Sequence, residues 1–139
     1  MARICIDQFY DWKKQGHRWV CLTAYDAPTA RVLESASVPM ILVGDSLGNV
    51  ILGHDSTVPV TMDDMVHHSA AVRRGAENTF VVCDMPFLAA QISDEDAIRN
   101  AGRLIQEGMA DAVKIEGGGA RVGTIRRIVD AGIPTMGHL

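Results

Sequence analysis

Short, almost continuously apolar segments recur along the chain and predict β-strands. They occupy residues 19–23, 40–43, 80–83, 112–115 and 133–136. Their apolar residues follow one another without alternating with polar ones, which is the pattern of strands that are covered on both faces. A parallel sheet is therefore favoured over an antiparallel one.

Segments with helical spacing lie between these strands. Apolar residues within 97–105 fall at offsets 0, 1, 4, 7 and 8, on one face of a helix. Residues 122–129 repeat this spacing, and further helices are predicted for residues 6–16 and 27–35. The order is a helix, then a strand and a helix four times, then a fifth strand. This order predicts an α/β fold, and a doubly wound sheet and a (β/α)8 barrel both begin in this way.

Polar residues and glycines indicate where helices begin and end. Thr61 is followed three residues later by Asp64, and Ser93 by Asp96, and each pair is an acidic variant of the capping box. Helix ends are predicted at three glycines, which are Gly75, Gly108 and Gly132. Residues 47–59 have no clear period and are predicted to form an extended loop, which at this length is usually functional.

Composition narrows the class of protein. A chain of 139 residues that is 47% hydrophobic has the size of one domain. The net charge of −4 and the scattered basic residues argue against nucleic-acid binding. The three cysteines form no CxxC pair and are interpreted as reduced, buried, intracellular residues. With no apolar segment near the ~20 residues of a membrane helix, the protein is expected to be soluble and cytoplasmic.

Polar residues follow the apolar strands at their carboxyl ends, where ligands bind in parallel α/β proteins. Asp45, Asp84 and Glu116 follow three successive strands, so their carboxylates are candidates to share a cation. A set of oxygen ligands favours Mg²⁺ over zinc. The structural alternative is that each carboxylate caps the loop or helix that follows it.

Lys114 and His138 are further candidates at the same edge. The Lys114 ammonium would hold a substrate carboxylate or enolate oxygen, with a Schiff base as the competing catalytic role and a salt bridge to a carboxylate as the structural alternative. His138 suits hydrogen bonding to a ligand because imidazole titrates near neutral pH. Residues 117–119 are three glycines that give a weak indication of phosphate binding.

Six motifs, in order and spacing, resemble the ketopantoate hydroxymethyltransferase family over the whole chain. They are Val43-Gly44-Asp45-Ser46-Leu47-Gly48, Gly53-His54-Asp55-Ser56-Thr57, Ala70-Ala71-Val72-Arg73-Arg74-Gly75, Asp84-Met85-Pro86-Phe87, Val113-Lys114-Ile115-Glu116-Gly117-Gly118 and Gly137-His138-Leu139. The segment Thr23-Ala24-Tyr25-Asp26 also matches the family.

The resemblance implies a (β/α)8 barrel, of which residues 1–139 would be the N-terminal portion of a single domain. This portion would contain an N-terminal helix and about the first five strands with four helices. By the same resemblance Asp45 and Asp84 would bind Mg²⁺, and Glu116 would do so directly or through water. Asp45, Ser46, Asp84 and Lys114 would contact the keto acid, and His138 matches an active-site histidine.

The resemblance also implies transfer of a hydroxymethyl group from 5,10-methylenetetrahydrofolate to 3-methyl-2-oxobutanoate through a Mg²⁺-stabilised enolate. The product would be 2-dehydropantoate, in pantothenate biosynthesis. The expected partners are a small 2-oxo acid and folate, with no nucleic acid and no membrane, in a homo-oligomer that is decameric in the family.

Family chains are about twice as long, and their proton-abstracting glutamate lies beyond residue 139. The 139-residue chain alone is therefore expected to bind metal weakly and not to catalyse transfer.

Two other interpretations remain open at this point. One is a related 2-oxo acid lyase or mutase of the phosphoenolpyruvate mutase and isocitrate lyase kind, which shares the barrel and the metal-held keto acid. The other is a non-catalytic half-barrel that associates with itself or with a partner chain through its free strand edge.

Overall fold

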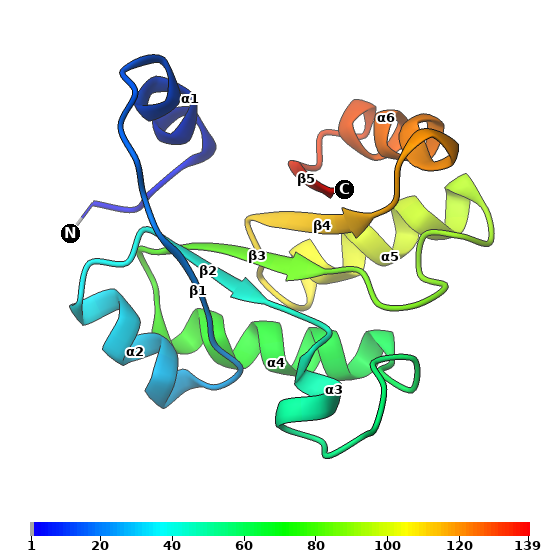
Figure 1. Ribbon diagram of the computed structural model, residues 1–139, viewed down its shortest axis with the longest axis horizontal. Helices are drawn as coiled ribbons and strands as arrows, with labels where there is room; N and C mark the ends of the chain where they lie inside the picture. The colour runs from blue at the N-terminus through cyan, green and yellow to red at the C-terminus, as the bar shows by residue number, and fades with distance from the viewer. Residues whose placement is uncertain (1) are drawn as a thin grey trace.

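The predicted alternation of strands and helices is present in a computed structural model, which describes residues 2–139 (Figure 1). The strands are β1 (Cys21–Thr23), β2 (Met40–Val43), β3 (Phe80–Asp84), β4 (Ala112–Glu116) and β5 (Thr135–His138). The helices are α1 (Ile6–Lys14), α2 (Ala27–Ser35), α3 (Leu47–Val50), α4 (Met62–Gly75), α5 (Asp94–Gln106) and α6 (Val122–Asp130), with a short 3₁₀ turn, η1 (Gly119–Arg121). No helix within residues 2–139 has the length and apolar character needed to cross a membrane.

The order of the strands decides between the two α/β architectures. All neighbouring strands are parallel and the order is β1-β2-β3-β4-β5, so each new strand is added on the same side of the previous one. A doubly wound sheet reverses this direction at a switch point, whereas a barrel does not. The fold is therefore a partial (β/α)8 barrel, as the resemblance implied.

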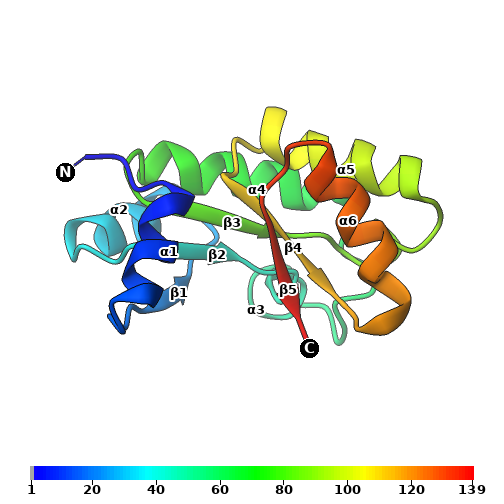
Figure 2. The same ribbon diagram turned by 90° about the horizontal axis from the view of Figure 1, so that it is seen from above.

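The two faces of the sheet pack against different elements because side chains alternate along each strand. Ile41, Val81 and Val113 point to the outer face, where they form one buried cluster with the helices that follow the strands. Phe80 and Val82 point to the inner face and pack against α1. Figure 2 shows α1 over the starting end of the strands, with α5 and α6 beside β4 and β5.

Aromatic rings attach α1 to the inner face. The Phe9 ring lies 5.2 Å from the Phe80 ring and 5.3 Å from the rings of both Trp12 and Trp19, measured between centroids. These edge-on and tilted contacts are the geometry that aromatic pairs prefer. The cluster closes the end of the sheet that lies opposite the polar strand ends.

The helix starts predicted from sequence are confirmed. The Thr61 hydroxyl accepts a hydrogen bond from the Asp64 N–H at 3.1 Å, and the Asp64 carboxylate accepts one from the Thr61 N–H at 2.9 Å. Ser93 accepts from the Asp96 N–H at 3.1 Å at the start of α5. Each pair satisfies backbone N–H groups that the first turn of a helix leaves without partners.

The fifth strand begins at Thr135, two residues later than predicted. Pro134 has no N–H with which to donate to a ladder, so a strand starts more readily after it. The Ile133 N–H is also used elsewhere, because it donates to the Ile128 carbonyl at 3.3 Å and closes the end of α6. The apolar character of this segment therefore located the strand correctly but misplaced its first residue.

The predicted loop over residues 47–59 contains a helical turn that the sequence analysis missed, α3 (Leu47–Val50). Leu47 is fully buried and its carbonyl accepts a hydrogen bond from the Ile51 N–H at 2.9 Å. Gly48 lies so close to Val60 that an added Cβ would be 2.6 Å from a Val60 methyl carbon. One turn is too short for a helical period to be recognised in the sequence.

The cysteines were only partly predicted correctly. Cys83 is buried on the outer face of β3, and burial raises its pKa far above the usual range. Cys5 and Cys21 are exposed, so their interpretation as buried residues is wrong. Cys21 lies in β1, which pairs with β2 alone among the described strands, and Cys5 precedes α1.

Gly75, the last residue of α4, allows a close approach to α2. A Cβ added there would lie 2.1 Å from the Ala27 carbonyl oxygen.

We expect Gly75→Ala to destabilise the chain by about 1–3 kcal/mol, because the two backbones must move apart. Gly102→Ala in α5 is the matched control, since an added Cβ there would point into open space. That substitution should stabilise by about 0.5–1 kcal/mol through helix propensity. Urea unfolding of both variants measures the difference, and equal effects would contradict the close approach.

Candidate active site

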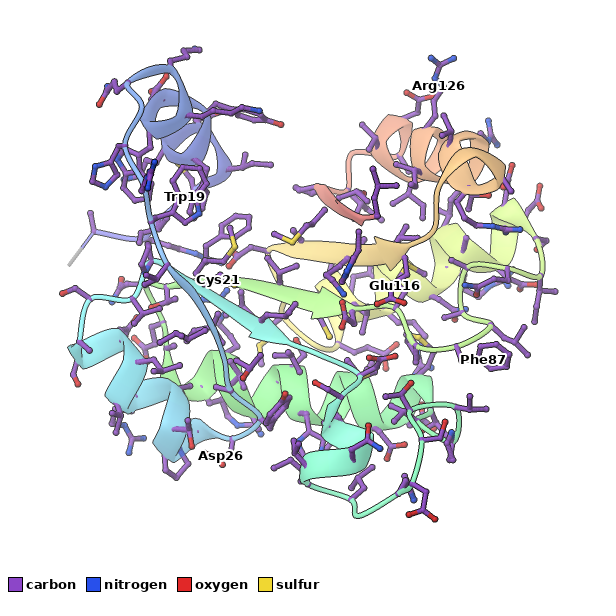
Figure 3. All side chains as sticks on the ribbon, in the orientation of Figure 1. Trp19, Cys21, Asp26, Phe87, Glu116 and Arg126 are labelled. Carbon is purple, nitrogen blue, oxygen red and sulfur yellow. The ribbon has the colours of Figure 1, made fainter. Side chains whose placement is uncertain are left out.

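The register of the parallel strands brings the predicted site residues together. Asp84 at the end of β3 pairs with Lys114 in β4, and Glu116 at the end of β4 pairs with His138 in β5. Asp84 and Lys114 share the inner face with residues two positions earlier on their strands, since side chains alternate. Figure 3 shows Glu116 at the carboxyl end of β4, far from Trp19 at the opposite end.

Opposite charges connect these residues across the sheet. The Lys114 ammonium donates to the Asp84 carboxylate at 2.6 Å and lies 3.7 Å from the Glu116 carboxylate. Asp84 and Lys114 are only 5% and 7% exposed, so water and salt weaken the attraction between them less than in an exposed pair. The His138 imidazole lies 3.6 Å from Glu116. The salt bridge that sequence analysis gave as the structural alternative for Lys114 is therefore present.

Asp45 approaches this cluster from the segment after β2. Its backbone N–H donates to the Asp84 carboxylate at 3.1 Å, so Asp84 accepts from Lys114 through one oxygen and from Asp45 through the other. Burial raises the pKa of the half-buried Asp45 carboxyl, and the negative charges of Asp84 and Glu116 raise it further. The Lys114 ammonium and the Thr57 hydroxyl oppose that rise.

A cavity of about 120 Å³ lies at this edge and is lined by Asp45, Asp84 and Glu116 together. All three residues thus border one space. Their side chains are not arranged as a ready metal site. Within residues 2–139 no three His, Cys, Asp or Glu side chains form a cluster that could hold a metal ion. Asp84 is turned towards Lys114 instead.

Two polar residues of this cavity were missed by the sequence analysis, namely Thr57 and Gln91. Thr57 ends the Gly53–Thr57 motif, so its position in a family motif was an available signal. Gln91 lies in the segment between β3 and α5 and belongs to no motif. Phe87, from the same segment, is 54% exposed at the cavity wall (Figure 3).

Ser46 joins the site through Gly44, which lies between Ser46 and Asp84. A Cβ added at Gly44 would be 3.0 Å from the Ser46 hydroxyl and 3.4 Å from an Asp84 carboxylate oxygen. Any larger residue would crowd these two groups. The Ser46 hydroxyl is also 2.9 Å from the Tyr25 hydroxyl, so it bridges the site and the turn after β1.

The three glycines after β4 have a backbone explanation. Gly117 has a φ of 121°, which L side chains rarely adopt, and the Arg121 side chain would lie 2.8 Å from an added Cβ. Gly119 begins the 3₁₀ turn η1. The geometry of the turn therefore accounts for Gly117, whereas no close contact explains Gly118 or Gly119.

The sequence as a whole matches known proteins. A family model described as ketopantoate hydroxymethyltransferase matches residues 3–139. The 3-methyl-2-oxobutanoate hydroxymethyltransferase of Heliobacterium modesticaldum is 55% identical over 137 residues, which cover 99% of this chain and 50% of that protein. The protein of the same description from Moorella thermoacetica is 56% identical over 138 residues, 51% of its length. The chain therefore spans about half the length of the curated relatives it matches.

A solved structure supports the fold independently. The crystal structure of 2,3-dimethylmalate lyase, a PEP mutase/isocitrate lyase superfamily member, superposes with a TM-score of 0.73. The match covers 99% of this chain and 52% of the lyase chain, at 17% sequence identity. At this identity the similarity concerns the fold alone. The lyase or mutase alternative shares this architecture, but the sequence similarity favours the transferase.

Proposed function

The chain belongs to the ketopantoate hydroxymethyltransferase family, and on this premise we propose that the protein transfers a hydroxymethyl group from 5,10-methylenetetrahydrofolate to 3-methyl-2-oxobutanoate. The product would be 2-dehydropantoate, an intermediate of pantothenate biosynthesis. The observation that carries the proposal is the 55% identity to a relative of that name over 99% of this chain. We further propose that residues 1–139 are the N-terminal portion of one (β/α)8 barrel and that the protein acts in the cytoplasm as a homo-oligomer, decameric as in the family.

Asp45 and Asp84 are proposed to hold Mg²⁺, with Glu116 bound directly or through water. The chemistry of the donors fits, because all are carboxylate oxygens and Mg²⁺ takes one or two carboxylates and keeps several waters. An ionised carboxylate has about four lone-pair sites, so Asp84 retains acceptor capacity beside its bonds to Lys114 and Asp45. A cation would also relieve the repulsion that contributes to the raised pKa of Asp45.

When bound, Mg²⁺ supplies Lewis acidity towards the oxygens of a 2-oxo acid, which makes the C3 proton of the substrate more acidic. Lys114 would hold the substrate carboxylate or enolate oxygen with its ammonium, and Ser46 would donate a hydrogen bond to the same anion. The His138 imidazole, in the neighbouring strand β5, would donate a further hydrogen bond to the substrate. We assign the abstraction of the C3 proton to no residue within 1–139.

Activity is tested with the chain combined with the C-terminal half of the Moorella thermoacetica relative as a separate polypeptide, which we call the complemented protein. Size-exclusion chromatography first establishes that the two polypeptides associate. We expect Mg²⁺-dependent deuterium exchange at C3 of 3-methyl-2-oxobutanoate, and neither polypeptide alone should support it. An associated but inactive complex would contradict the proposal, and turnover of an oxalyl or phosphonate substrate would favour the lyase or mutase alternative.

Lys114 is expected to act as an electrostatic anchor and not to form a Schiff base. Its side chain donates to the Asp84 carboxylate at 2.6 Å, and an ammonium in such a pair has no free lone pair with which to attack a carbonyl. We expect no adduct when the complemented protein is treated with borohydride and keto acid and analysed by peptide mass spectrometry. A covalent adduct on Lys114 would overturn this role.

A further inference from the structure

The Ser46 hydroxyl has a hydrogen-bond partner that is not one of the candidate site residues. It lies 2.9 Å from the hydroxyl of Tyr25, which follows β1 and stands 21 residues earlier in the chain. The same hydroxyl and an Asp84 carboxylate oxygen both lie close to Gly44, 3.0 Å and 3.4 Å from where an added Cβ would be. Ser46 therefore has both a tyrosine hydroxyl and the carboxylate cluster nearby. A hydrogen bond to the tyrosine affects where the Ser46 hydroxyl hydrogen can point.

The main chain of Tyr25 is fixed by three neighbouring elements. A ring nitrogen of His68 in α4, Nδ1, lies 2.7 Å from the Tyr25 carbonyl oxygen. A carbonyl only accepts, so this nitrogen carries a proton and donates. Before it, the Ala24 N–H donates to the Leu42 carbonyl of β2 at 3.2 Å. After it, the Asp26 carboxylate accepts from the Thr29 N–H at 2.7 Å at the start of α2.

The direction of the hydrogen bond between the two hydroxyls matters to a ligand. If Ser46 donates to Tyr25, only oxygen lone pairs of Ser46 face the site, and these repel an anion. If Tyr25 donates to Ser46, the Ser46 hydrogen is free to point at an anionic oxygen. Carboxylate binding selects the second arrangement, and the resulting chain of two hydroxyls strengthens the donor that faces the ligand.

We propose that Tyr25 is a positioning residue, whose hydroxyl donates to Ser46 and thereby directs the Ser46 hydrogen to the carboxylate of a 2-oxo acid. The proposal rests on the proposed function, because that function supplies the anion. His68 acts one step further away, by holding the Tyr25 backbone in the turn between β1 and α2. The packing of the Tyr25 ring against the buried outer cluster is a separate role that phenylalanine also fills.

The main test is a double-substitution cycle measured by calorimetric titration of 3-methyl-2-oxobutanoate into the complemented protein with Mg²⁺. Tyr25→Phe keeps the ring and removes the hydroxyl, and should weaken keto acid binding about 3- to 10-fold, as expected for one hydrogen bond. In a Ser46→Ala background the same substitution should change affinity less than about 2-fold, since coupled residues are not additive. Tyr10→Phe is the matched control, because Tyr10 is 58% exposed on α1.

A second readout does not depend on affinity. The chain has two tyrosines, so labelling this polypeptide alone with 3-fluorotyrosine before it is combined with the C-terminal half gives two ¹⁹F signals, and Tyr10→Phe identifies that of Tyr25. Addition of keto acid should shift the Tyr25 signal, and Ser46→Ala should remove this shift. The affinity for Mg²⁺ alone should stay the same in Tyr25→Phe.

The outcomes separate this inference from the proposed function. Keto acid binding that is unchanged in Tyr25→Phe, or weakened equally with and without Ser46, would overturn the positioning role alone. A Tyr25 signal that is insensitive to Ser46→Ala would overturn the contact on which it rests. Absence of keto acid binding by the unsubstituted complemented protein would overturn the proposed function and the positioning role together.

Discussion

Asp111→Ala is expected to lower the free energy of unfolding by about 3–5 kcal/mol, because it leaves a buried arginine without its counter-charge. The side chains of Arg73 and Asp111 are 9% and 12% exposed and form an ion pair between α4 and the segment before β4. The Asp111 carboxylate also accepts from the Val81 N–H at 2.8 Å and from Arg3 at 2.7 Å. The substitution therefore removes a charge, a strand contact and a contact to the N-terminal segment together.

Chemical denaturation measures this loss as a shift of the midpoint at constant slope. Asp11→Ala is the matched control, since it removes an ion pair to Lys14 whose side chains are 63% and 77% exposed. Exposed pairs of this kind contribute about 0–1 kcal/mol. Equal stability losses in the two variants would show that burial of the Arg73 pair has no energetic consequence.

Asp84→Asn is expected to weaken Mg²⁺ binding and to lower deuterium exchange in the complemented protein by at least about 100-fold. Substituting even a residue that only hydrogen-bonds to a metal ligand lowers metal affinity or activity about 10- to 100-fold. Asparagine keeps the shape of the side chain and removes its charge. The Lys114 ammonium, 7% exposed, then loses the partner that it contacts at 2.6 Å. Stability should fall as well, since a buried charge without its partner is costly.

The double variant Asp84→Asn with Lys114→Met separates these two effects. Replacing both members of a buried pair by uncharged groups is often neutral, so the double variant should regain stability without regaining Mg²⁺ binding. Magnesium titration calorimetry and urea unfolding of the single and double variants provide both measurements. Recovery of metal binding in the double variant would exclude Asp84 as a ligand.

The types of the elements were predictable because the chain contains strong local signals. The helix predicted over residues 27–35 has those bounds in the structure, where Asp26 caps it and Pro28 lies in its first turn. Element ends were less predictable where tertiary contacts decide them. Pro134 delays β5, and a buried Leu47 forms the single turn of α3 in a segment without a helical period.

The location of the candidate site followed from the rule that parallel strands end at one edge. This rule placed Asp84, Lys114 and Glu116 together, but it did not indicate which groups would pair. The Asp84 and Lys114 contact depends on strand register, which places these two residues opposite each other. The contact between Tyr25 and Ser46 joins residues on different turns, so no local pattern in the sequence indicates it.

The aromatic cluster on α1 also determines what intrinsic fluorescence reports. Both tryptophans of the chain, Trp12 and Trp19, lie in it with their ring centroids 6.0 Å apart. Trp19 stands at the starting end of the sheet, away from Glu116 (Figure 3), and Trp12 packs beside it. Tryptophan emission therefore reports, without any added label, whether α1 is packed against the sheet. It should respond when that helix detaches and stay nearly constant while ligands fill the opposite end.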